Sequence, residues 1–302
     1  MDIQNLTGLE KPVVKLIETV SEGVGVVGNR VFEFDAKKIK RISVTESEAE
    51  KQKIIAQAEG QSEALEILSR AEKRFAIEQY NKQINLENII VQSRDNLEGR
   101  EVSDVPVDVD WTSRFLNIAQ DISREEMQAV LAKILSDEIQ KPGTFSFSLL
   151  EIMKVLSRND LLTFKNFIAL STESGLMAIQ GGGRKSLEKY KLGFDEYLHL
   201  ASLGLFSQST TLSYNIDIFS SKPLKIKIGK QLFLISHDNK SKKLFRMSAY
   251  VFSSAGSELR SILLEDISEN DIFDKYKTDF ITQVEKEGFT VSTIDIKDKL
   301  NE

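Results

Sequence analysis

A glycine-rich stretch, QGGGRKS at residues 180–186, is the part of this sequence that comes nearest to a phosphate-binding loop. A P-loop needs the pattern G-x-x-x-x-G-K-[ST], in which backbone amides curl around the phosphates and the lysine reaches them. Here Arg184 separates Gly183 from Lys185, and Ala178 stands where the first glycine of the pattern belongs. The spacing therefore favours a flexible loop over a nucleotide site.

Other residue types that carry catalysis are sparse. The chain has no cysteine, which excludes thiol nucleophiles, zinc–thiolate sites and disulfides. Of its two histidines, His199 has no metal-binding residue four positions later, and His237 lies in the turn-like stretch HDNKSKK. No G-x-S-x-G nucleophile elbow occurs in the sequence. We therefore predict that the protein is not an enzyme and holds no cofactor or metal ion, with scattered carboxylate pairs as the open route to a hydrolase.

Four acidic side chains in GREVSDVPVDVDW, residues 99–111, raise the question of a site for a divalent cation. Calcium-binding loops, however, need a loop glycine and a closing bidentate glutamate at set positions. Neither stands at the required spacing here. The stretch is instead typical of an acidic linker that ends in residues able to cap a helix.

The composition of the whole chain sets the class of protein. With 302 residues, 41% of them hydrophobic and 28% charged, the chain is long enough for about two globular domains. Its net charge of −6 disfavours nucleic acid as a partner, because such binding depends on neutralising phosphates. The sequence shows neither a signal peptide pattern nor a run of 18 apolar residues. We expect a cytoplasmic protein, with peripheral contact at the inner membrane as the alternative.

Residues 9–28 predict a short amphipathic helix that three glycines loosen at its end. The simpler interpretation is a helix that docks on the rest of the protein. The alternative is contact with a membrane surface or a protein partner, because a basic cluster follows closely and would suit an anionic surface. The residues assigned to that contact are Val13, Val14, Leu16, Ile17, Val20, Val24, Lys37, Lys38, Lys40 and Arg41.

A long helix or helical hairpin is predicted over residues 46–99, which contain no proline and one interior glycine. Its apolar side chains form a narrow, alanine-rich stripe of the coiled-coil kind. Because helices in water are stabilised mainly by packing, so thin a stripe needs a cover, either from its own chain or from another copy. We therefore predict a homo-oligomer, whose self-association residues are Ile54, Ala58, Leu65, Leu68, Ala71 and Phe75.

The stretch SREEMQAVLAKILSDEIQKPGTFS, residues 123–146, predicts a complete helix. Ser123 and Glu126 fit a capping box at its start, and Pro142 with Gly143 ends it. Apolar side chains recur every three or four residues in between, as on the buried face of a bundle helix. Apolar helical stretches on both sides of it predict a compact helical bundle.

The same region resembles a known family. Residues 101–160 are similar to the central motif of an uncharacterised bacterial family, domain of unknown function 2806, with the patterns D-x-D-W, D-I-S-x-E-x-M-Q, A-x-I-L, E-I-x-x-P-G-x-F-S and L-x-x-L. Leu131 departs mildly from it, since tryptophan or another bulky residue is usual there. The resemblance implies no catalytic residue, and the looser similarity of the family to helical abortive-infection proteins implies a role in phage defence. The matching residues are Asp108, Asp110, Trp111, Asp121, Ile122, Ser123, Glu125, Met127, Gln128, Ala132, Ile134, Leu135, Glu138, Ile139, Pro142, Gly143, Phe145 and Ser146.

From residue 191 the pattern changes from helical to mixed. A helix ending at Gly204 precedes the alternating strands LKIKI and QLFLI, which a hairpin at residues 228–232 joins. A further strand then runs into a helix at Ser254. This order of helix, hairpin, strand and helix is winged-helix-like. The candidate helices are acidic, which favours a structural role or a protein contact over DNA binding.

We therefore expect a mostly α-helical protein with a C-terminal α+β part. The leading functional hypothesis is a non-enzymatic scaffold or effector that forms homo-oligomers, associates with a membrane and acts in bacterial phage defence. The alternative is a nucleic-acid-binding regulator that uses the winged-helix-like module. The expected segments are an N-terminal apolar helix with a basic stretch (1–43), a coiled-coil-like helix and linker (44–106), a helical bundle with the family motif (107–190), and the α+β module (191–302).

Overall fold

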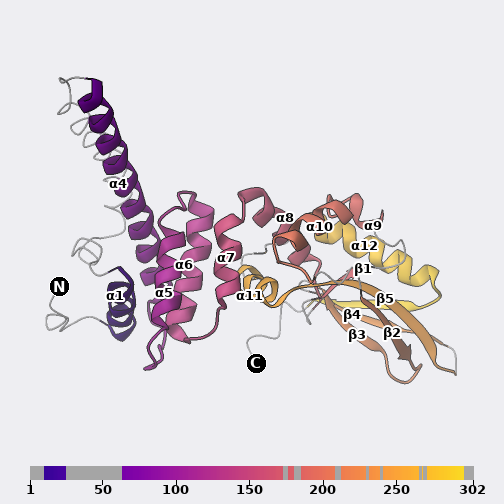
Figure 1. Ribbon diagram of the computed structural model, residues 1–302. Helices are drawn as coiled ribbons and strands as arrows, with labels where there is room; N and C mark the ends of the chain where they lie inside the picture. Colours follow the sequence, from indigo (N-terminus) through magenta and orange to yellow (C-terminus); the bar gives the residue numbers. More distant parts are fainter. Residues whose placement is uncertain are drawn as a thin grey trace. The chain divides into compact units, whose positions relative to one another are not determined.

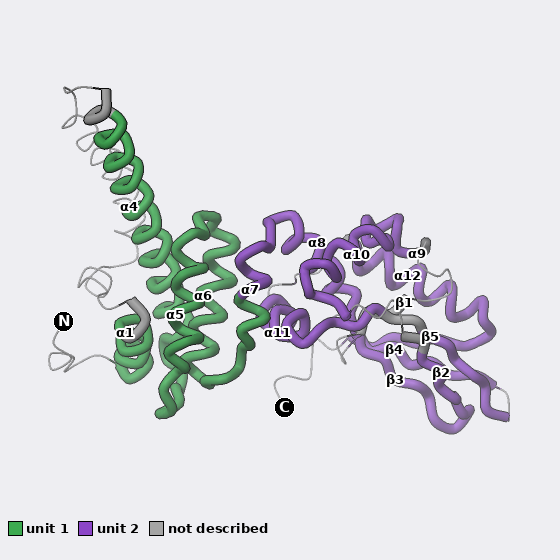
Figure 2. Tube along the Cα trace, in the orientation of Figure 1, with its two compact units in different colours: residues 1–150 green, residues 151–302 purple. Residues whose placement is uncertain are grey.

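The chain forms two compact units in a computed structural model, residues 1–150 and residues 151–302 (Figures 1 and 2). The finer division into four segments stays a prediction. Helices predominate among the described residues, as expected, and the described strands all belong to the second unit. The structure describes residues 10–24, 63–172, 176–179, 185–207, 212–228, 231–238, 241–264, 267 and 271–295.

The described residues of unit 1 fold into packed helices. Helix α4 (Glu63–Leu97) packs along α6 (Glu125–Gln140), and α1 (Lys11–Val24) packs on α5 (Val109–Ala119) with further contacts to α4 and α6. Helix α7 (Phe147–Val155) begins where this unit ends. The long helix expected from the sequence is thus confirmed over residues 63–97. The fully buried side chains of the core include Leu16, Val20, Phe115, Leu131, Ile134, Leu135 and Leu150.

Helix α6 begins one residue later than the expected capping box would place it. Arg124 is the N-cap residue, has an extended backbone and makes no side-chain cap hydrogen bond. Ser123 therefore precedes the cap and is one position too far from the helix for the box, so the predicted Ser123–Glu126 box is wrong. At the other end, the helix stops at Gln140, and Gly143 turns the chain with a φ of 82°. The predicted Pro-Gly stop is confirmed.

Unit 2 combines helices with two antiparallel sheets of three strands each, in the orders β1-β5-β2 and β3-β4-β6. The expected α+β character of this part of the chain is confirmed. Its helices are α8 (Arg158–Ala169), α9 (Lys185–Glu188), α10 (Phe194–Ser202), α11 (Ser254–Leu263) and α12 (Asp271–Lys286). Its strands are β1 (Leu176–Ile179), β2 (Leu212–Ile218), β3 (Leu224–Ile228), β4 (Gln231–Ser236), β5 (Lys243–Val251) and β6 (Thr290–Asp295).

The expected hairpin lies in the second sheet. Ile228 pairs with Gln231, so two residues connect β3 to β4 as predicted. The strand β5 also runs into a helix as expected, because Ser253 caps α11 by accepting the amide of Gly256. The hairpin, however, is extended by β6, whereas β5 belongs to the other sheet. The winged-helix-like arrangement is therefore not confirmed.

Aromatic rings make much of the core of unit 2. Phe164 of α8 meets Phe206 edge-on, with ring centroids 5.8 Å apart, and Tyr250 of β5 stacks on Tyr197 of α10. Such ring pairs add to the stabilisation that comes from burying their area. The rings hold α8 and α10 against the first sheet and thereby fix the positions of the two helices that carry His199 and its partner.

Candidate functional site

Helix α4 is much longer than the helix that packs along it. It contains 35 residues, about 52 Å at 1.5 Å per residue, whereas α6 contains 16 residues, about 24 Å. Its C-terminal half is packed into unit 1, and its N-terminal half extends beyond α5 and α6 (Figure 1). The connection between α5 and α6 marks the boundary, because the side-chain amide of Asn85 donates a 2.8 Å hydrogen bond to the carbonyl oxygen of Gln120 there.

Large apolar side chains are exposed on the extending half of α4. Ile67 is 55% exposed, Leu68 is 58% exposed and Phe75 is 63% exposed. Ala71, between them, is exposed as well. Single apolar side chains on a surface are ordinary, whereas apolar side chains that group together mark an interaction surface. These four residues are named the exposed α4 stripe.

The exposed α4 stripe continues the face of the helix that is buried in unit 1. An α-helix has about 3.6 residues per turn, so Leu86 lies five full turns after Leu68 and points to the same side. Ser93 follows Phe75 by the same interval, is fully buried, and places its hydroxyl 3.2 Å from the carbonyl oxygen of Ala132 in α6. One continuous face is therefore covered by α6 at one end and left uncovered by the described residues at the other.

A polar cluster separates the two halves of this face. The ammonium group of Lys82 lies 2.8 Å from the carboxylate of Glu78 and 3.6 Å from that of Asp121. The hydrogen bond from Lys82 lowers the pKa of Glu78, and the same bond raises the pKa of Lys82. The cluster borders an open cavity of about 470 Å³ between α4 and the connection from α5 to α6.

Half of the predicted self-association residues belong to the exposed α4 stripe. Ile67 completes the stripe and was missed by the sequence prediction, because it lies at the edge of the seam. Leu65 is part of α4 without a described side chain, and Ile54 and Ala58 lie outside the described residues. Contact of the stripe with another copy stays a prediction. The three predicted residues found in the stripe are Leu68, Ala71 and Phe75.

The residues predicted to touch a membrane or partner are placed differently. Leu16, Ile17 and Val20 are at most 4% exposed, because α1 packs on α5. Their burial favours the docking-helix interpretation of this segment, since a buried side chain is not available to a bilayer. Val13 and Val14 are partly exposed. For the rest, either the side chain or the whole residue lies outside the described part of the chain: Val24, Lys37, Lys38, Lys40 and Arg41.

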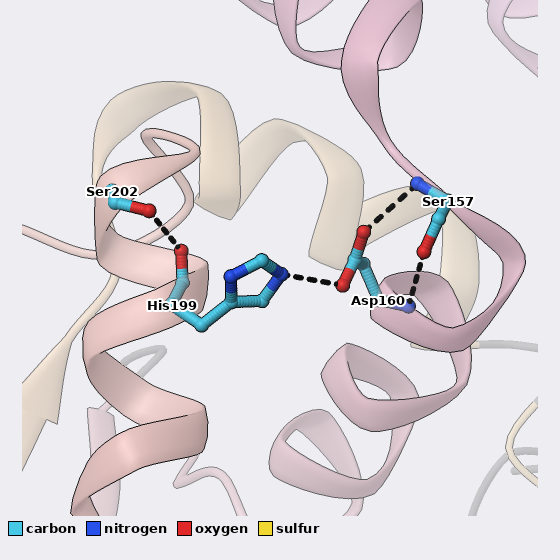
Figure 3. Close-up of polar contacts among 4 residues, drawn as sticks. All are labelled: Ser157, Asp160, His199 and Ser202. Atoms are coloured by element: carbon cyan, nitrogen blue, oxygen red, sulfur yellow. Dashed lines mark hydrogen bonds and ion pairs between the residues drawn. The ribbon is translucent and has the colours of Figure 1, made fainter.

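An acid–base pair joins two helices of unit 2 (Figure 3). Nε2 of His199 in α10 lies 2.7 Å from Oδ1 of Asp160 in α8, and the other Asp160 oxygen accepts the amide of Ser157. Burial alone would raise the pKa of Asp160, but hydrogen bonds from Ser157 and His199 outweigh it and lower that pKa. The hydroxyls of Ser157 and Ser202 both bond to backbone atoms. The pair therefore links the two helices and does not have the geometry of a nucleophilic triad.

The second histidine is buried in unit 2. His237 is 4% exposed, and its Nε2 lies 2.7 Å from the carbonyl oxygen of Ile218. Among the described residues, no three potential metal ligands gather at one place. Within the part of the chain that the structure describes, no helix combines the length and apolar character that crossing a membrane requires. The glycines of the phosphate-loop-like stretch, at 181–183, lie outside the described residues.

Two motif residues of the helical region, Asp108 and Glu138, have structural roles. Asp108 caps α5 by accepting the amide of Trp111 at 2.9 Å. Glu138 is 1% exposed, and its two carboxylate oxygens accept the amides of Gly143 at 2.6 Å and Phe145 at 2.9 Å. These charge-assisted bonds compensate the desolvation of a buried carboxylate. The pattern E-I-x-x-P-G-x-F-S therefore specifies the turn between α6 and α7.

Comparison with known proteins adds a family. No curated protein and no solved structure matches the chain. A family model described as protein of unknown function (DUF2806) matches residues 69–275, which is more than half of the chain. The matched span contains the helices α5 to α11, with the motif residues whose roles are described above. The chain belongs to the DUF2806 family.

Proposed function

We propose that this protein is a non-enzymatic scaffold or effector that forms homo-oligomers through the exposed α4 stripe. The proposal rests on the contrast within α4, where one helix face is buried at Leu86 and exposed at Leu68. Fully burying a leucine or phenylalanine side chain is worth about 1.5–3 kcal/mol relative to leaving it exposed. The large side chains of the stripe therefore offer a gain in free energy that only a covering surface can realise.

A second copy of the same stripe is a cover of suitable shape. Leu68 and Phe75 are large, and Ala71 between them is small, so two identical stripes can interlock. Contacts between identical surfaces close into dimers with two-fold symmetry.

Light scattering on the full chain tests this proposal. The wild-type protein is expected to have at least twice the mass of one chain at micromolar concentration, and Phe75→Glu is expected to lower it to the mass of a monomer. Val155→Glu is the matched control, because Val155 is 59% exposed on α7 and lies outside the stripe. A monomeric wild-type protein contradicts the proposal, and so does an oligomer that Phe75→Glu leaves unchanged.

Light scattering together with urea unfolding distinguishes contact with a second copy from a cover supplied by the chain's own residues 46–62. A cover from the same chain keeps the wild-type protein monomeric and makes Phe75→Glu less stable to urea. A cover from another copy makes the mass rise with protein concentration. Only the second result supports the proposal.

The cellular role that we propose is phage defence, on the ground of the family's looser similarity to abortive-infection proteins. Plaque counts on bacteria that express the chain test it. Protection by the wild-type protein, together with its loss in Phe75→Glu, would link defence to assembly. Equal plaque counts with and without the chain would contradict this role for the phages tested.

Two other roles have less support. Membrane contact through the buried face of α1 would require this helix to leave unit 1, because the predicted contact residues Leu16 and Val20 are fully buried. Liposome flotation of the full chain and of a chain without residues 1–43 tests that role. Nucleic-acid binding rests on the winged-helix-like layout of residues 191–302 and predicts retention of the full chain on DNA that weakens as salt rises.

A further inference from the structure

We infer that two copies pack their exposed α4 stripes antiparallel, with Leu68 of each copy beside the partner's Ala71. The inference rests on the proposed self-association of α4 and adds its direction and its register. Both follow from which parts of the helix face are covered and from the sizes of the side chains along it.

The covered half of α4 blocks a parallel pair. Leu86 lies on the same face as Leu68 but is 7% exposed, because α6 packs along this half of the helix. Two parallel helices that met along this face would each bring α5 and α6 into the space between them. In an antiparallel pair only the extending halves overlap, and the α5 and α6 helices of the two copies lie at opposite ends of the overlap.

Side-chain sizes give the register. In coiled-coil terms, Leu68 and Phe75 occupy one seam position of α4, and Ala71 occupies the other. A parallel pair sets like against like, so a layer with two phenylalanines would alternate with a layer of two alanines. An antiparallel pair sets one seam position against the other, so Leu68 meets the partner's Ala71. Each layer then joins one large residue with one small one, which packs evenly.

The flank of the seam fits the same register. On the flank of the seam, Arg74 comes near the partner's Ile67, so basic side chains do not oppose one another there.

Disulfide crosslinking distinguishes an antiparallel from a parallel pair of α4 helices. The chain has no cysteine of its own, so every disulfide comes from the introduced residues. A chain carrying Leu68→Cys and a differently tagged chain carrying Ala71→Cys are expected to form a mixed disulfide. Phe75→Cys alone is expected to form none. The register sets residue 75 opposite position 64, three helical turns or about 16 Å from the partner's residue 75, and a disulfide spans at most ~7 Å between Cα atoms. Val155→Cys, on an exposed position of α7, measures crosslinking by random collision.

A mixed dimer that forms about tenfold faster than the Val155→Cys dimer, without a Phe75→Cys dimer, supports the antiparallel register. A rapid Phe75→Cys dimer shows a parallel pair and overturns the inference, while the homo-oligomer stands. An oligomer in which neither disulfide forms faster than the collision control overturns the inference as well. If light scattering shows the cysteine-free chain to be a monomer, the proposed function fails, and the inference fails with it.

Discussion

The two halves of α4 share one helix face but differ in what surrounds it. From Leu86 to Leu97 the apolar side chains of this face are buried, and α6 and α5 pack against them. From Ile67 to Phe75 the same face carries side chains that are more than half exposed. A helical pattern of apolar residues therefore tells which face of a helix needs a cover, but it does not tell which surface provides one.

The same substitution at two positions five turns apart tests this difference most strongly. Leu86→Ala removes a side chain that is 7% exposed, and we expect it to lower the free energy of unfolding by about 2–5 kcal/mol. Leu68→Ala removes a side chain that is 58% exposed, and we expect the monomer to lose no more than about 0.5 kcal/mol. Urea unfolding at a protein concentration too low for assembly measures both values.

Light scattering of these two variants completes the comparison. Leu68→Ala is expected to raise the concentration at which the chain assembles, whereas Leu86→Ala is expected to lower the stability of the single chain. If both variants lose the same stability as monomers, the stripe is covered within one chain, and the difference between the two halves of α4 disappears. If Leu86→Ala has almost no effect, the packing of α4 on α6 is contradicted.

The turn after α6 extends the comparison from apolar packing to a buried polar group, because hydrogen bonds to the carboxylate of Glu138 hold this turn. Glu138→Ala leaves the amides of Gly143 and Phe145 without their acceptor, and we expect a loss of about 3 kcal/mol in the free energy of unfolding. Glu138→Gln keeps one acceptor oxygen and is expected to lose less. The matched control is Glu151→Ala on the exposed face of α7. Equal urea midpoints for Glu138→Ala and Glu151→Ala would remove the structural explanation of the motif.

Local patterns in the sequence were sufficient to predict several of the helices and the hairpin. The helix ends at Gly143 and Gly204 follow from glycine adopting a positive φ, and the connection between β3 and β4 follows from alternation on both sides of a glycine. The capping box failed by one position, because Arg124 took the N-cap in place of Ser123. Boundaries of this kind depend on the loop before the helix, which local spacing does not determine.

Contacts between distant residues could not be predicted. His199 has no partner near it in the sequence, because Asp160 stands 39 residues earlier on another helix. The strand β4 pairs with β6, and β1 pairs with β5, although several other elements separate the members of each pair in the chain. Local sequence patterns do not indicate which strands share a sheet, so the winged-helix prediction could not take the strand pairing into account. For the exposed α4 stripe, spacing alone identified Leu68, Ala71 and Phe75, but not where the cover from α6 ends.

The smallest effect that we predict concerns the pair of Asp160 and His199 between α8 and α10, which is neither fully buried nor fully exposed. Asp160→Asn keeps an oxygen that can accept the amide of Ser157 but removes the charge that faces His199. We expect a loss of about 1 kcal/mol in the free energy of unfolding near pH 6. Ser157→Ala is the companion variant, because it removes the hydroxyl of the capping box and leaves the pair with His199 in place.

The pH dependence of this loss separates the charge from the cap. The pKa of Asp160 is lowered in the folded chain, so the ionised carboxylate stabilises the fold fully above the unfolded value of about 3.9. This contribution disappears as the pH falls through the lower pKa of the folded state. The difference between the wild-type protein and Asp160→Asn should therefore be present at about pH 5 and shrink as the pH falls below about 3.9, as measured by urea unfolding at each pH. A difference that stays the same over this range would mean that the carboxylate acts only as a hydrogen-bond acceptor at the start of α8.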